Sequence, residues 1–140
     1  MKYKIVVSIV GLLALGVGGF LYMKSPTSEP LLDGVLIRET MSAMGSETIT
    51  TVIASGQVSV ISDFPGQSTD YILTPVQMNQ INDVLAKQDG TVHTFAPDPG
   101  IVYDGTYSLQ LKYNNGSITH TQSIPEYEAL MQLVRAGEGE

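Results

Sequence analysis

Two histidines are the side chains of this chain best suited to move a proton or bind a metal ion near neutral pH. His93 lies in the segment TVHTFA and His120 in the segment SITHTQ, and both segments have the composition of β-strands. The two imidazoles could therefore meet on one face of a sheet. Neither segment contains a carboxylate that would complete a metal site, so we expect ordinary sheet histidines and no metal centre.

Loop aspartates form the second group with possible chemistry. Clustered loop carboxylates can bind Ca²⁺ through oxygen ligands. The sequence has no Asp-x-Asp-x-Asp-Gly spacing, and Asp followed by Pro or Gly is common in ordinary turns. We therefore expect no metal and no cofactor at the four loop aspartates, which are Asp63, Asp70, Asp98 and Asp104.

No catalytic motif is found in the sequence. It contains no G-x-S-x-G, H-E-x-x-H, Walker or dinucleotide-binding pattern, and it has no cysteine to supply a thiolate or a disulfide. With only two histidines, a catalytic triad has few possible bases. We expect a protein without catalytic activity.

A proline-rich loop with apolar side chains is the best candidate for contact with another protein. Residues 95–103 read FAPDPGIVY, in which prolines stiffen the chain between aromatic and aliphatic residues. Such a loop fits a protein interface, and it fits equally well a loop whose apolar side chains close the core. The candidate contact residues are Phe95, Pro97, Pro99, Ile101 and Tyr103.

The order of segments between Ile49 and Val134 also suggests protein binding. A strand runs into Ser55-Gly56, and a middle helix, the strand DGTYSLQL, the strand ITHT and a last helix led by Pro125 follow. This order resembles the emfourins, small protein inhibitors of thermolysin-like metalloproteases. The resemblance implies an α+β fold and a protein-binding function. The chain departs from that family in lacking a Gly-Gly pair at the first turn and in its apolar N-terminus, and no inhibitory residue is carried over.

Hydrophobic periodicity predicts the order hairpin, helix, hairpin, helix. The strand-like segments are residues 34–40, 48–54, 57–62, 107–113 and 117–122. One helix begins at Pro75 and stops before Gly90, and another extends from Pro125 to Ala136, while residues 63–70 read as a loop. We expect an α+β fold, a two-layer sandwich of antiparallel β-hairpins with two helices packed on one face.

Capping residues mark the start of both helices. Thr74 and Gln77 form a capping box around Pro75, which is tolerated at the first helical position. Ser123 and Glu126 repeat the S-x-x-E pattern at the second helix.

An uncharged apolar segment at residues 5–23 is long enough, at roughly 28 Å as a helix, to cross a bilayer. Lys2 and Lys4 precede it and favour a cytoplasmic N-terminus with the C-terminal domain outside the cytoplasm. The alternative is a secretory signal that is cleaved, although the apolar run continues beyond the small residues where a cut would fall. Small residues suited to contact with another membrane helix, or simply typical of membrane helices, are Ser8, Gly11, Ala14 and Gly18.

Charge divides the chain into two parts. The formal charge of the whole chain is −7, but residues 25–140 hold four basic and all 14 acidic side chains, a net charge of −10. A domain this acidic has no basic face for phosphates, which excludes nucleic acid as a partner. We expect a signal anchor at residues 1–24, a linker at 25–33, an extracytoplasmic domain at 34–136 and a disordered tail at 137–140.

These features together predict a single-pass, membrane-anchored interaction module or an accessory subunit of a membrane complex. Its expected partners are the lipid bilayer and another membrane or extracytoplasmic protein. A protease inhibitor or modulator is the alternative function, and a small hydrolytic enzyme is less favoured. Cleavage of the N-terminal segment would make the protein secreted.

Overall fold

The computed structural model describes residues 31–64, 66–101, 103 and 105–139. The segment expected to be a membrane anchor, with Ser8, Gly11, Ala14 and Gly18, lies outside the described residues, as does most of the expected linker. Within the described residues, no helix combines the length and the apolar character that a membrane crossing requires. The elements, in order, are β1 (Val35–Ala43), β2 (Ser46–Ile53), β3 (Gln57–Ser62), β4 (Gln67–Ile72), α3 (Pro75–Ala86), β5 (Thr106–Tyr113), β6 (Gly116–His120), α4 (Pro125–Ala136) and the 3-10 turn η1 (Gly137–Gly139).

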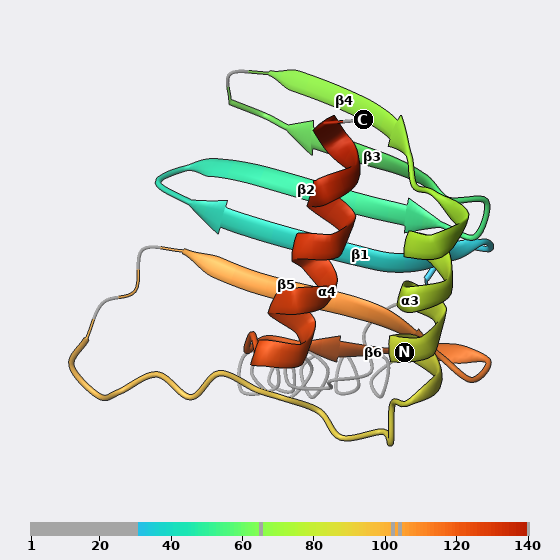
Figure 1. The fold of residues 1–140 in the computed structure, drawn as a ribbon. Coiled ribbons are helices and arrows are strands. Elements are labelled where there is room, and N and C mark those ends of the chain that lie inside the picture. Colours follow the sequence, from blue (N-terminus) through green and yellow to red (C-terminus); the bar gives the residue numbers. More distant parts are fainter. Residues whose placement is uncertain (1–30, 65, 102, 104, 140) are drawn as a thin grey trace, which may run out of the picture.

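The strands form one antiparallel sheet in the order β4-β3-β2-β1-β5-β6 (Figure 1). The first four strands are a meander, after which α3 and a long connection bring β5 back to the free side of β1. β1 therefore lies inside the sheet, with Ile37 opposite Val52 on one side and Leu111 on the other. This register places three buried aliphatic side chains side by side, and they form the centre of the core.

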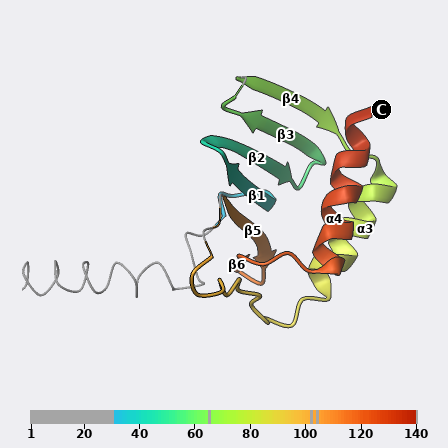
Figure 2. The same ribbon diagram turned by 90° about the vertical axis from the view of Figure 1, so that its left-hand side faces the viewer.

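Both helices cover the same face of the sheet (Figure 2). Ile81 of α3 and Leu130 and Val134 of α4 are buried in the core together with the inward side chains of β1, β2, β3 and β5. No helix of the described residues covers the opposite face (Figure 2). The α+β fold of antiparallel strands and two helices predicted from the sequence is confirmed.

The first helix begins as the sequence predicts. Thr74 is the N-cap of α3, its side chain accepts a hydrogen bond from the backbone N–H of Gln77, and the Gln77 side chain accepts one from the backbone N–H of Thr74. Pro75 occupies the first turn, where no backbone donor is needed. This capping box fixes where the chain leaves β4 and turns over the sheet.

The second helix begins differently from the prediction. Its N-cap is Ile124, which has no side-chain hydrogen bond to the helix, and Pro125 again lies in the first turn. Ser123 donates instead to the Glu128 carboxylate at 3.3 Å, so the expected pair of Ser123 and Glu126 does not form a capping box. The apolar face of α4, with four buried side chains, holds this helix by packing.

Two further segments differ from the sequence expectations. Residues 67–70 were expected in a loop but belong to β4, an edge strand whose exposed polar side chains give no alternating pattern. The domain therefore has six strands where the sequence pattern indicated five. Residues 137–139, expected in a disordered tail, form η1, because Gly137 is buried against Leu73 and Tyr71.

Candidate functional site

The turns at one end of the sheet carry large exposed apolar side chains. β1 and β3 both end there, and β5 begins there, since Ser42 pairs with Thr106. Met44 in the β1–β2 turn is 88% exposed, Phe64 after β3 is 76% exposed and Ile101 before β5 is 55% exposed. The turns after β1 and β3 and the start of β5 lie at the end of the sheet opposite the beginning of β1 (Figure 1). We call this set the apolar rim, which comprises Met44, Phe64, Phe95, Ile101 and Tyr103.

The proline-rich loop of the rim folds on itself. The rings of Phe95 and Tyr103 meet edge to face with centroids 4.8 Å apart, and the backbone N–H of Asp98 donates to the Tyr103 hydroxyl at 3.1 Å. The backbone N–H of Phe95 also donates to the Thr121 hydroxyl at 3.0 Å, which attaches the loop to the end of β6. Phe95 and Tyr103 remain exposed and do not close the core. The remaining contact candidates, Pro97, Pro99 and Ile101, lie exposed in the same loop.

Met44 combines two unfavourable properties at the tip of its turn. Its φ of 53° lies in the left-handed region, where a side chain with a Cβ costs about 1 kcal/mol and Asn or Gly is preferred. Its side chain is also almost fully exposed. Neither the fold of the turn nor the core requires a methionine here, so the residue suggests a contact that the isolated chain does not make.

The two histidines predicted to be able to share a sheet face do meet, but only His120 lies in a strand. The expected strand around His93 does not form, and residues 91–98 are an irregular connection. The two imidazole rings stack with centroids 5.4 Å apart, and the backbone N–H of His93 donates to Nδ1 of His120 at 3.1 Å. This bond fixes the neutral tautomer of His120 with its proton on Nε2, an atom that is buried without a hydrogen-bond partner. Tyr127 of α4 packs against the His120 ring at 4.6 Å. The pair fastens the segment around residue 93 to β6.

Burial controls the titration of this histidine. His120 is fully buried, and desolvation, with a smaller contribution from His93, lowers its pKa from 6.5 to about 4. A groove of about 660 Å³ adjoins the pair, and His93, Tyr127 and Gln88 line it. Burial also raises the pKa of Tyr127, helped by the charges of Glu126 and Asp89. The charged side chains of Lys87, Asp89 and Glu126 also line the groove.

Of the four aspartates expected in loops, Asp63 has a structural role and Asp70 lies in β4. Asp63 Oδ1 accepts hydrogen bonds from the backbone N–H of Glu47 at 2.6 Å and from the Ser46 hydroxyl at 3.2 Å, which ties together the ends of β2 and β3. Asp104 lies outside the described residues. Among the described residues, no three histidine or acidic side chains converge to hold a metal ion.

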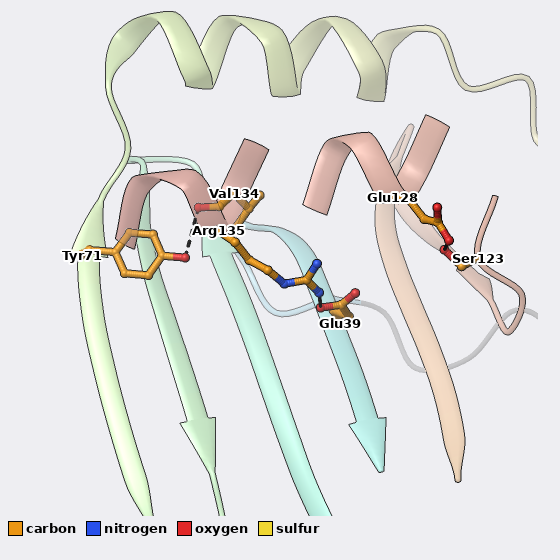
Figure 3. Close-up of polar contacts among 6 residues, drawn as sticks. All are labelled: Glu39, Tyr71, Ser123, Glu128, Val134 and Arg135. Carbon is orange, nitrogen blue, oxygen red and sulfur yellow. Dashed lines mark hydrogen bonds and ion pairs between the residues drawn. The ribbon is translucent and has the colours of Figure 1, made fainter. Parts of the chain in front are cut away.

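An ion pair joins the buried Glu39 of β1 to the half-exposed Arg135 of α4, and no pattern in the sequence predicts it. Nη2 of Arg135 donates to Oε2 of Glu39 at 2.6 Å, and the Glu39 side chain is 3% exposed whereas that of Arg135 is 43% exposed (Figure 3). In the same turn of the helix, the backbone carbonyl of Val134 accepts a hydrogen bond from the Tyr71 hydroxyl at 3.1 Å. α4 is thus bonded both to the centre of the sheet and to its edge strand.

The surroundings of Glu39 form a second, smaller pocket. It has a volume of about 330 Å³ and is lined by Met41, Tyr107 and Met131 beside the ion pair. Burial and the negative charge of Glu39 raise the pKa of Tyr107 to about 12. The buried carboxylate of Glu39 is paired with Arg135, and the carboxylate of Glu128, which accepts a hydrogen bond from Ser123, also lines the pocket. The ion pair positions α4 over the sheet.

Because Glu39 is buried and Arg135 is half-exposed, substitution of one residue should destabilise the fold more than substitution of the other. Arg135→Met leaves a carboxylate buried without a counter-charge, which we expect to lower the free energy of unfolding by about 3 kcal/mol. Glu39→Gln leaves the half-exposed guanidinium in contact with water and should cost about 1 kcal/mol. The double variant should be more stable than Arg135→Met alone. Urea denaturation of the four proteins measures these differences, and equal losses for the two single variants would contradict this account.

The depressed pKa of His120 makes stability depend on pH. The unfolded chain takes up a proton near pH 6.5 whereas the folded chain resists until about pH 4. This contribution to the free energy of unfolding is therefore complete above pH 6.5 and is lost as the pH falls towards 4, by about 3 kcal/mol at most. His120→Asn, which retains an acceptor near Nδ1, should remove this part of the pH dependence. His93→Asn, which retains the backbone donor, should preserve it; a slope unchanged in His120→Asn would refute the assignment.

The geometry therefore offers two candidate features, an apolar rim for contact and a loop attached to β6 by two histidines beside a groove. The emfourin resemblance rests only on the order of segments between residues 49 and 134. Comparison of the chain with models of protein families, with curated proteins and with solved structures finds no match.

Proposed function

We propose that this protein is a non-catalytic interaction module, held at a membrane by residues 5–23, that binds another membrane or extracytoplasmic protein through the apolar rim. The observation that carries the proposal is the exposure of five large apolar side chains on the turns at one end of the sheet. Elsewhere on a soluble domain, single exposed apolar residues are common, but an apolar set of this size at one end favours contact with a partner.

The rim has the mechanical properties that binding favours. Its three turns are attached to a six-stranded sheet, and its longest loop is braced by the contact of Phe95 with Tyr103 and by the hydrogen bond to Thr121. Side chains held in place before binding lose less conformational entropy when a partner arrives. Aromatic residues and methionine are also the types enriched at protein interfaces.

The position of the rim suits a domain attached at its N-terminus. The described chain begins at Leu31, beside the β5–β6 turn, and β1 leads away from there for nine residues. At about 3.3 Å per residue, β1 separates the rim from the attachment point by about 30 Å. A partner could therefore reach the rim without displacing the linker.

A substitution at Met44 separates binding from folding. Met44→Asn places a residue that tolerates positive φ at the turn, so we expect the melting temperature to stay the same or rise by a few degrees. It also removes an apolar contact, so partner proteins should co-purify less with the tagged full-length protein after mild detergent extraction from cells that naturally express it. Ile101→Ser should have the same effect on recovery.

The matched control is Val76→Ser, which changes an exposed apolar residue on α3 outside the rim. Recovery of the same partners should be unchanged in this variant. If Met44→Asn and Ile101→Ser recover as much partner as the natural protein, the rim is not the binding surface.

The membrane part of the proposal has its own test. We expect the protein to stay in the membrane fraction after carbonate washing and its intact mass to include residues 1–24, because the apolar run is retained as a helix in the bilayer. A mass shortened near Gly16 to Gly18, with the protein in the soluble exported fraction, would show that the segment is a cleaved signal instead.

A further inference from the structure

The two edges of the sheet are treated differently by the rest of the chain. At the β6 edge, the backbone carbonyl of His93 accepts hydrogen bonds from the backbone N–H groups of Thr121 and Gln122, so the connection before β5 lies against the end of that strand. At the β4 edge, no described element lies beyond the strand (Figure 1). β4 is thus the open edge of the domain.

The hydrogen-bond pattern shows which backbone groups of β4 are available. The N–H of Leu73 donates to the carbonyl of Gly56, so Leu73 directs its backbone groups toward β3. Because these groups alternate in direction along an antiparallel strand, Thr69 and Tyr71 also bond to β3. The N–H and carbonyl groups of Ser68, Asp70 and Ile72 point away from the sheet.

Three features that commonly protect an edge strand, namely lysine, proline and a bulge, are absent from the described residues of β4. Gln67–Ile72 contains no lysine and no proline, and its six pairs with β3 continue without a bulge. Asp70 is its single charged residue. A regular, nearly uncharged edge of this kind can accept another strand.

We propose that β4 pairs antiparallel with β4 of a second copy of this chain, centred on Thr69, so that two sheets join into one. In this register Thr69 faces the partner's Thr69, and Ser68 faces the partner's Asp70 on both sides of the centre. Each Ser68–Asp70 pair uses the outward backbone groups for two hydrogen bonds. The serine hydroxyl also lies on the same face as the opposite carboxylate and donates to it.

Symmetry and charge favour this register over the one centred on Asp70. A two-fold axis perpendicular to the sheet must pass through a residue that faces itself, because facing side chains lie on the same side of an antiparallel sheet. Centring on Asp70 would place two carboxylates opposite each other, which is destabilising. Centring on Thr69 gives a Thr–Thr pair flanked by two hydroxyl–carboxylate pairs.

Net charge predicts how the pairing responds to salt. Two domains with a net charge of −10 each repel one another, and no Lys or Arg lies between Gln57 and Ile72 to offset this repulsion. Raising the ionic strength from about 0.01 M to about 1 M shortens the screening length from about 30 Å to about 3 Å. The paired fraction should therefore increase with salt, whereas pairing driven by opposite charges would decrease.

A single engineered cysteine tests the register, because the natural chain has none. In the proposed pair the two copies of residue 69 lie at a non-hydrogen-bonded position, with Cα atoms about 4.5 Å apart, within the range of about 4.4 to 6.8 Å that a disulfide spans. The full-length Thr69→Cys protein in mild detergent should therefore become mostly disulfide-linked under a gentle oxidant. Asp70→Cys and the exposed control Val76→Cys should link only at the rate of random collision.

A second variant keeps the test valid if the cysteine disturbs the strand. Ser68→Pro removes an outward donor and leaves the bonds between β4 and β3 in place, so the melting temperature should change little. Combined with Thr69→Cys, it should reduce the disulfide-linked fraction at least tenfold. The proposal is overturned if Thr69→Cys links no faster than Val76→Cys, if Asp70→Cys links faster than Thr69→Cys, or if Ser68→Pro leaves the linkage unchanged.

Discussion

One carboxylate inside the domain constrains how its two layers fit together. Glu39 points from β1 into the core between Thr50 and Leu109, where an unpaired charge would be costly. The guanidinium of Arg135 compensates this charge, and to do so it must extend from the last turn of α4. With Tyr71 bonded to the carbonyl of the preceding residue, that turn is held at two places across the sheet. Apolar packing sets the distance of α4 from the sheet, and these contacts set its direction.

The sequence predicts the fold well where the type of a residue determines its local conformation. Thr74, Pro75 and Gln77 define the start of α3 by local chemistry, and the alternation of residues 107–113 defines β5 because one face of that strand is buried. β4 was missed because an edge strand buries little, and Gln67–Ile72 therefore shows no periodicity. The cap at Ser123 was wrong because a local pattern competed with a nearby carboxylate, that of Glu128.

The candidate site was only partly predictable for a related reason. The loop around Phe95 could be identified because its residues are adjacent in the sequence, whereas the turns that carry Met44 and Phe64 reach the same end of the sheet only through the antiparallel topology. The partners Glu39 and Arg135 are 96 residues apart, so no spacing rule could pair them. The sequence did contain an indication that Glu39 is paired. Glu39 shares the inward face of β1 with Ile37, and a charge on that face requires a partner.

The presence of both helices on one face of the sheet has a consequence for a paired molecule. A two-fold axis perpendicular to the sheet places the four helices of the pair on one side. The two faces without helices then form one continuous face of a twelve-stranded sheet. The same axis places the two N-terminal attachment points at opposite ends of this sheet. If both chains continue into one bilayer, the two-fold axis has to lie along the membrane normal. The twelve-stranded sheet then lies parallel to the membrane, with its helices in one layer.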